Sequence, residues 1–130
     1  MLRLYRFVES CLPDTFENIT YDSMDEDKQG QVGIFAYQSE DDAESLEGTI
    51  WENIKFQIQV TANSGESGMQ EVSDYLRDFI KIIESKMDSG DNTLEIIQCK
   101  HIGPKAIKIK TNDYNIALWR CVINIKYNFV

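Results

Sequence analysis

The sequence predicts an α+β protein, in which a mainly antiparallel β-sheet packs against a long central helix and a short N-terminal helix. The expected elements follow the order helix, strands, helix, strands, which is typical of this class. Between residues 69 and 87 the apolar positions recur at helical spacing. Near the C-terminus every second position is apolar, which is the period of a strand with one buried face: Ala117, Trp119, Cys121, Ile123, Ile125, Tyr127 and Phe129.

The N-terminal half is expected to hold one short helix and three strands. Apolar residues at spacings of three and four predict the helix over residues 2–12, and Pro13 ends it. Strands are expected over residues 18–21, 32–38 and 49–61, the last with a bulge near Glu52 or Asn53. Acidic loops are expected between these strands, at 22–30 and 39–48.

In the C-terminal half, a glycine-containing linker at 62–68 precedes the long helix, which is expected over 69–87 with a length of about 30 Å. This helix should pack face to face with the strand at 49–61. Shorter strands are expected over 93–99 and 106–110, separated by a turn at Gly103-Pro104. A turn at 111–115 leads into the last strand.

The length of the last strand indicates assembly rather than catalysis. At about 3.3 Å per residue, the stretch from Tyr114 to Phe129 would span roughly 50 Å. A domain of this size has a diameter under about 40 Å. The strand must therefore bend strongly, or extend to meet another chain.

Length and composition fit one domain, residues 1–130, of an ordinary soluble globule with 42% apolar and 27% charged residues. The sequence shows no basic-then-apolar leader and no apolar run near ~18 residues, so we expect neither a signal peptide nor a membrane span. Cys11, Cys99 and Cys121 lack C-x-x-C spacing and are expected to be reduced thiols of a cytoplasmic protein, with Cys121 in the core.

The net charge of −9 is unevenly distributed. Residues 1–53 hold thirteen acidic and three basic residues, whereas residues 54–130 hold nine acidic and ten basic ones. One interpretation is that acidic loops keep the protein soluble. The other is self-complementarity, in which an acidic patch of one copy faces a basic patch of the next and head-to-tail contacts build a ring or filament. In either case tight nucleic-acid binding is disfavoured.

The residues for common catalytic sites are missing, so we expect no enzyme, no cofactor and no catalytic residue. His101 is the single histidine, has no nucleophile motif around it, and is expected to be structural. Gly65-x-x-Gly68 could bind an anion before a helix, but such pairs are common in plain linkers. The acid clusters at 22–27 and 40–47 do not follow the EF-hand order, so solvated loops are favoured over a Ca²⁺ or Mg²⁺ site. Trp51 and Trp119 are expected in the core or at subunit contacts.

Several segments, taken in order, resemble the tail-terminator (tail-completion) proteins of tailed bacteriophages and phage-like contractile particles, many of which are labelled minor capsid proteins in Firmicute phages. These segments are Val32–Tyr37, Asn53–Val60, the helix with Tyr75-Leu76, His101–Lys105, Tyr114–Ile116 and Asn124–Tyr127. The resemblance covers roughly residues 1–130 and is a match of organisation rather than of a catalytic motif.

The resemblance implies a structural protein in the virion tail or neck, assembled in the bacterial host cytoplasm. Its partners would be a homo-oligomeric ring of six copies, the tail tube protein, neck or connector proteins, the tail sheath if the particle is contractile, and DNA only as it passes through the lumen. The alternatives are another neck connector or tail-tube ring protein of the same particle, or a small cytoplasmic α+β dimeric binding module. The charge asymmetry then predicts these interface residues: Asp25, Glu26, Asp27, Glu40, Asp41, Asp42, Lys105, Lys108, Lys110 and Arg120.

Overall fold

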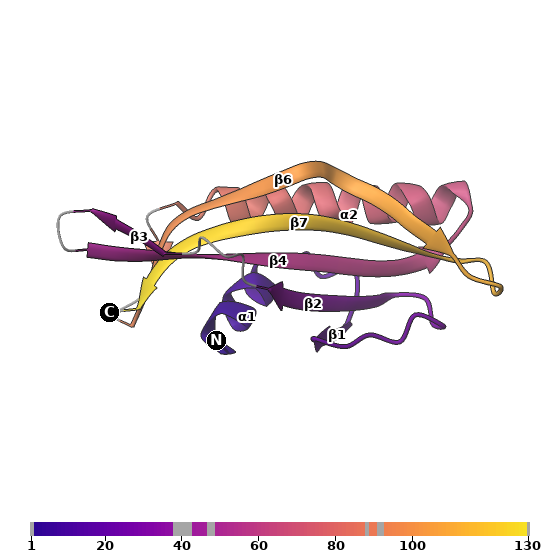
Figure 1. Cartoon of the computed structure of the whole chain (residues 1–130). Helices are drawn as coiled ribbons and strands as arrows, with labels where there is room; N and C mark the ends of the chain where they lie inside the picture. Colours follow the sequence, from indigo (N-terminus) through magenta and orange to yellow (C-terminus); the bar gives the residue numbers. More distant parts are fainter. Residues whose placement is uncertain (1, 38–42, 47–48, 88, 91–92, 130) are drawn as a thin grey trace.

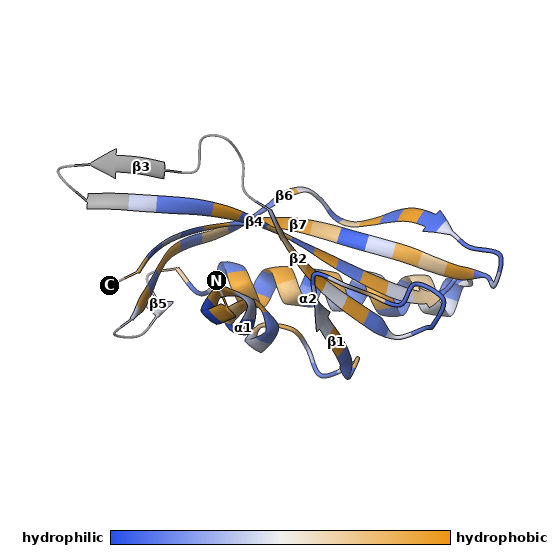
Figure 2. Cartoon of the chain, turned by 60° about the horizontal axis from the view of Figure 1, so that its bottom comes forward, coloured by the Kyte–Doolittle hydropathy of each residue, from blue (hydrophilic) through white to orange (hydrophobic). Residues whose placement is uncertain are grey.

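The computed structural model describes residues 2–37, 43–46, 49–87, 89–90 and 93–129. These residues form one seven-stranded sheet in the order β1-β2-β4-β7-β6-β5, with β3 paired to β4 off this path, and two helices on the same face of the sheet (Figures 1 and 2). The elements are α1 (Leu2–Ser10), β1 (Asn18–Tyr21), β2 (Gln31–Tyr37), β3 (Ala43–Leu46), β4 (Thr49–Asn63), α2 (Glu66–Glu84), β5 (Ser89–Gly90), β6 (Leu94–Thr111) and β7 (Ile116–Phe129). All strand pairs are antiparallel except β1–β2. The α+β class with a mainly antiparallel sheet is therefore confirmed.

The core lies between the helices and one face of the sheet. Along β4 and β7, apolar and polar residues alternate (Figure 2), because successive side chains of a strand point to opposite faces. On the helix-covered face, Phe56 and Ile123 pair across the two strands and are fully buried. The buried face of α2, which includes Val72, Leu76, Phe79, Ile80 and Ile83, belongs to the same core. This confirms the expected packing of the long strand against the helix. The opposite face of the sheet is called the outer face below.

Helix α2 begins and ends three residues earlier than expected. Gly65 is its N-cap, so the end of the expected linker forms the first helical turn instead, and residues 85–87 are a turn. The rest of that linker continues β4 to Asn63. The expectation of a long central helix is not confirmed, since α2 has 19 residues and lies on one face of the sheet (Figure 1).

Two expectations in the first half of the chain are wrong. The segment expected to be an acidic loop at 39–48 contains β3, which pairs with the start of β4. The bulge expected near Glu52 or Asn53 does not form, because both residues pair in continuous register with Tyr127 and Lys126 of β7. Trp51 lies before the part of β4 that joins β2, on the outer face. Its ring lies 5.1 Å from the ammonium group of Lys126. This contact accommodates the Trp51 side chain on the outer face, so β4 keeps its regular alternation and no bulge is required to turn Trp51 toward the core.

The turn expected at Gly103-Pro104 is also wrong, because β6 runs through it as one strand of 18 residues. Between the pairs Ile102–Val122 and Ile107–Arg120, β6 advances five residues while β7 advances two. The surplus forms a wide bulge in which Gly103 has a φ of +72°, a conformation that favours glycine. The long β7 ladder resumes beyond the bulge, so the two expected short strands are joined into one.

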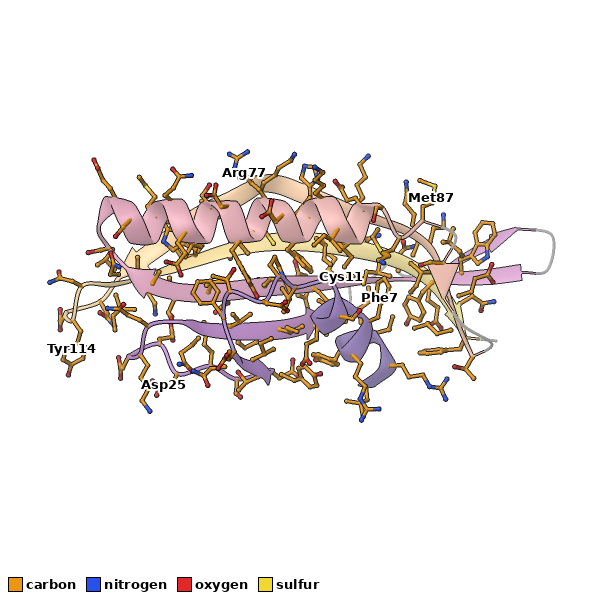
Figure 3. All side chains as sticks on the ribbon, turned by 180° about the vertical axis from the view of Figure 1, so that it is seen from behind. Phe7, Cys11, Asp25, Arg77, Met87 and Tyr114 are labelled. Carbon is orange, nitrogen blue, oxygen red and sulfur yellow. The ribbon has the colours of Figure 1, made fainter. Side chains whose placement is uncertain are left out.

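The sheet extends beyond the helices at its ends. Figure 1 shows β3 and the start of β4 projecting at one end and the tip of the β6–β7 hairpin at the other, with β6 and β7 curved between them. Tyr114, which is 71% exposed, lies at that tip, and Asp25 lies toward the same end of the molecule (Figure 3). The predicted long C-terminal strand is confirmed by β7, which has 14 residues and is curved (Figure 1). Within the described residues, no helix combines the length and apolarity required to cross a membrane.

Candidate functional site

In the described part of the chain the sheet is bounded by β5 and β6 on one side and by β1 and β3 on the other, and the β6 and β1 edges differ in charge. On one side, β5 pairs only with Glu95 and Ile96 of β6, so beyond that point β7 is the only strand partner of β6 among the described residues. On the other side, β1 pairs only with β2 within the described part of the chain. An open strand edge presents unpaired N–H and C=O groups that can pair with another chain.

The edge formed by β6 is basic and partly apolar. Ile102, Ile107 and Ile109 are 43%, 39% and 41% exposed, which is high for isoleucine. Exposed lysines lie between and beside them: Lys100, Lys105, Lys108 and Lys110. Natural proteins use lysine, proline and bulges to protect such edges from indiscriminate pairing, and β6 has all three.

The first part of this edge is closed by the end of α2. The Glu84 carboxylate accepts a hydrogen bond from the backbone N–H of His101 at 3.0 Å, and the same oxygen lies 2.9 Å from Nδ1 of His101. Partial burial opposes ionisation of Glu84, but the hydrogen bonds from His101 and the charges of His101 and Lys105 outweigh it, so the pKa of Glu84 is lowered. His101 is therefore held in a structural pair, and the open part of the edge begins after Pro104.

The edge formed by β1 adjoins an acidic groove. A groove of about 450 Å³ lies between the end of α1 and β1 and is lined by Glu9, Leu12, Pro13, Asp14, Phe16, Glu17 and Ile19. Its apolar residues lie at the rim of the core, and three of its seven lining residues are acidic. No motif in the sequence marks this groove. The only available signal was the excess of acidic residues in the first 53 positions.

Some of the acidic and basic residues predicted to lie at a subunit interface contact one another within one chain instead. The ammonium group of Lys110 lies 3.0 Å from the Glu26 carboxylate, and the Asn112 side chain donates a hydrogen bond to the Glu26 backbone carbonyl at 3.1 Å. Asp25 lies 3.7 Å from Lys28 and accepts a hydrogen bond from the backbone N–H of Asp27. The acidic loop is thus attached to the base of the β6–β7 hairpin, and Glu26 and Lys110 neutralise one another.

The other predicted interface residues are dispersed. Lys105 and Lys108 lie on the open edge of β6 and are exposed, whereas Arg120 lies on the outer face of β7, half-buried, opposite Gln59 and Ile107. Glu40, Asp41 and Asp42 lie outside the described residues, as does Glu47 of the same predicted acidic loop.

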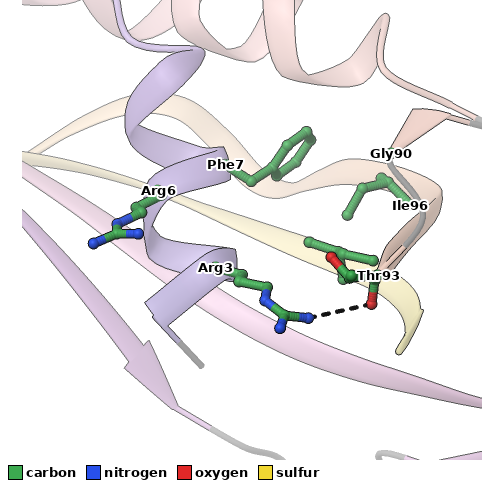
Figure 4. Close-up of a pocket in the computed structure, with 7 residues that line it drawn as sticks. Arg3, Arg6, Phe7, Gly90, Thr93 and Ile96 are labelled. Atoms are coloured by element: carbon green, nitrogen blue, oxygen red, sulfur yellow. Dashed lines mark hydrogen bonds between the residues drawn. The ribbon is translucent and has the colours of Figure 1, made fainter. Parts of the chain in front are cut away.

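A cavity lies between α1 and the start of β6 (Figure 4). It has a volume of about 500 Å³ and is lined by Arg3, Arg6, Phe7, Gly90, Thr93, Leu94 and Ile96. The Arg3 guanidinium donates a hydrogen bond to the Thr93 carbonyl at 3.5 Å. The seven described residues of the lining offer positive charge and apolar surface, and none of these seven is an acid, a thiol or a histidine.

The three cysteines lie in the hydrophobic core. Cys11, Cys99 and Cys121 are free and buried, and burial raises the pKa of both Cys99 and Cys121 to about 12. The expected core position of Cys121 is confirmed. Among the residues that the structure describes, no three histidine, cysteine or acidic side chains are grouped so as to hold a metal ion.

No protein-family model matches the chain, and no curated protein matches it either.

Proposed function

We propose that this chain is a structural subunit of a ring that caps the tail tube of a phage or phage-like particle, ends tube polymerisation and joins the tube to the head-side neck. The observation that carries the proposal is the length of β4, β6 and β7, which have 15, 18 and 14 residues and extend past the helices (Figure 1). Most strands in single domains have 3–10 residues. Strands that outrun their own helix layer suit a sheet that neighbouring copies complete.

The resemblance to tail terminators supplies the particular role within this class. The ring has six copies, and its partners are the tail tube protein, neck or connector proteins, and the sheath if the tail contracts. In this role the helix along the sheet is α2, the counterpart of the long central helix expected from the sequence. The role is structural, and the protein acts in the virion tail or neck after assembly in the host cytoplasm.

The acidic loops have a role in the same proposal. Asp25 and Asp27 lie on the loop beside the hairpin base, and this loop and the acidic segment at 40–47, part of which is β3, help to line the ring or its rim. Acidic walls would not retain passing DNA, because like charges repel. Reversing Glu40, Asp41 and Asp42 to lysine tests this part. Unchanged assembly and unchanged particle function would contradict it.

Light scattering and negative-stain electron microscopy of the purified protein test the proposal. Single rings with a mass near six times 15.0 kDa, which is about 90 kDa, are the expected result. Long stacked tubes would indicate a tail-tube protein of the same particle instead. A stable dimer with no ring at any concentration would favour the dimeric binding module, for which the cavity beside Arg3 and Arg6 is the available ligand site.

A further inference from the structure

We infer that successive copies of this chain join edge to edge, with the open part of β6 in one copy pairing antiparallel with β1 of the next. This inference rests on the proposed ring and deepens it by naming the contact surface. The occupant of the β6 edge is a second copy of this chain, and the acidic groove beside β1 receives the lysines of β6.

The direction of the strands supports this joint. β2 is antiparallel to β4, β4 to β7, and β7 to β6, whereas β1 is parallel to β2. β1 and β6 therefore run in opposite directions within one chain. Rotation about an axis along the strands keeps each direction, so β6 of one copy meets β1 of the next as an antiparallel pair. Contact between two different edges of the same subunit is head-to-tail, which closes into a ring when the rotation permits.

The charge of the two edges favours this pairing over pairing of like edges. The open part of β6 carries Lys108, whose exposed side chain has no ion pair among the described residues, and Lys105, which is also exposed and whose charge acts on Glu84. The groove beside β1 carries Glu9, Asp14 and Glu17. A contact between two β6 edges would bring lysines together, and like-charge contacts oppose wrong pairings.

The length and chemistry of the open segment also fit. The backbone N–H of His101 is already hydrogen-bonded to Glu84, and Pro104 has no N–H. The part of β6 that can pair with another strand is therefore confined to residues 105–111. β1 has four residues, a matching length. Ile107 and Ile109 stand exposed in this segment, and the groove beside β1 offers the half-buried Phe16 and Ile19 as apolar partners. A ladder this short is weak alone, and closure of the ring supplies a second contact for every copy.

A charge swap tests the joint. Lys108→Glu alone and Glu17→Lys alone should each raise the protein concentration needed for assembly by about tenfold, because each places like charges across the contact. The double variant should recover assembly, since the pair is re-formed with its signs exchanged. Glu71→Lys, which makes the same charge change on the exposed face of α2, is the matched control and should assemble as the parent does. Circular dichroism of each variant reports whether it is folded.

Cysteine cross-linking provides a second measurement that does not depend on charge. Asn18→Cys and Ile109→Cys are prepared as separate proteins, mixed and oxidised, and the three native cysteines are buried. A disulfide dimer that forms in the mixture, but not in either protein alone nor when Glu71→Cys replaces one of them, is the expected result. A dimer of Ile109→Cys with itself would overturn the inference in favour of a two-fold contact between β6 edges.

The results separate this inference from the proposed function. If rings form but neither the charge swap nor the cross-link responds, the ring uses another surface, and the inference fails while the ring role stands. If the protein stays monomeric at every concentration and inside its particle, both fail.

Discussion

Glu84, the last residue of α2, accepts hydrogen bonds from both the backbone N–H and Nδ1 of His101, at 3.0 and 2.9 Å. A carboxylate at the C-terminus of a helix is unfavourable with respect to the helix dipole. Here Glu84 connects the helix end to β6, and its carboxylate accepts a hydrogen bond from a backbone N–H on a strand edge that would otherwise be unpaired. The pair therefore determines where that edge begins to be free.

Replacing Glu84 by glutamine should lower the free energy of unfolding at pH 7 by about 1 kcal/mol. Hydrogen bonds to a charged group contribute roughly 1.5–3 kcal/mol, and this value is reduced because about a third of each side chain is exposed and solvent weakens the interaction. Urea unfolding at neutral pH measures the difference. Glu71→Gln, an identical change on the exposed surface of α2, should change stability by less than about 0.5 kcal/mol.

The same pair gives a pH dependence. The folded-state pKa of Glu84 lies below its ordinary value of 4.5, so its stabilising contribution is fully present above that pH. It is lost as the pH falls through the lowered value. The stability difference between the parent and Glu84→Gln should therefore be constant near neutral pH and shrink below about pH 4.5. A difference that grows in acid would contradict this assignment.

Local pattern was sufficient to predict the ends of β1 and β7 closely, because each follows from residues adjacent in sequence. It failed where the deciding partner is distant. β3 is a short acidic segment that becomes a strand because β4 extends far enough to pair with it. The strand through Gly103 and Pro104 continues because β7 supplies a ladder on both sides of the bulge.

The candidate site could likewise be predicted where it depends on local composition, but not where it depends on contacts between distant residues. The basic residues from position 98 onward and the acidic residues of the N-terminal half were evident in the sequence. The structure places Lys105 and Lys108 on β6 and Glu9, Asp14 and Glu17 beside β1, at opposite edges of one sheet. Two pairs were missed. Glu84–His101 and Glu26–Lys110 join residues 17 and 84 positions apart, and only the strand order brings them together. The second pair neutralises two residues that the charge pattern had assigned to a subunit interface.

Removing the hydroxyl of Tyr75 and removing that of Tyr5 should have opposite effects on the free energy of unfolding. The Tyr75 hydroxyl is buried with no hydrogen-bond partner among the described residues, and burial raises its pKa. An unpaired buried polar group costs free energy, so Tyr75→Phe should leave stability unchanged or raise it by up to about 1 kcal/mol. Tyr5 is the matched control, because its hydroxyl donates to Asp22 at 2.6 Å and burial with this bond raises its pKa to about 12. Tyr5→Phe should cost about 1–2 kcal/mol. Equal effects of the two substitutions in denaturant titrations would contradict the assignment.

The three cysteines should be unreactive in the native protein. Burial raises the pKa of each thiol, to about 12 for Cys99 and Cys121, so very little reactive thiolate exists at about pH 8. A colorimetric thiol assay should therefore find no fast-reacting group in the folded protein and three in concentrated guanidinium chloride. One fast thiol in the native state would show that a cysteine is accessible, and would require its replacement before the cross-linking experiment.

The hydroxyl of Thr61 attaches the acidic loop to the sheet, and its loss should be costly. Thr61 is fully buried, donates to the Lys28 carbonyl at 2.6 Å and accepts from the Gln31 N–H at 3.0 Å. Thr61→Val keeps the shape but leaves both backbone groups unpaired, so the free energy of unfolding should fall by about 2 kcal/mol. Hydrogen exchange should also accelerate at Gln31, while the Gly30 N–H, which bonds to the Thr61 carbonyl at 2.8 Å, stays protected. Thr111→Val, at an exposed threonine, is the control and should change neither quantity.

The Thr61→Val substitution also tests the subunit contact. Because this loop connects β1, whose edge is the inferred contact, to β2, Thr61→Val should weaken ring assembly more than its stability loss alone predicts. Assembly that tracks stability alone would show that the loop is not part of the subunit contact.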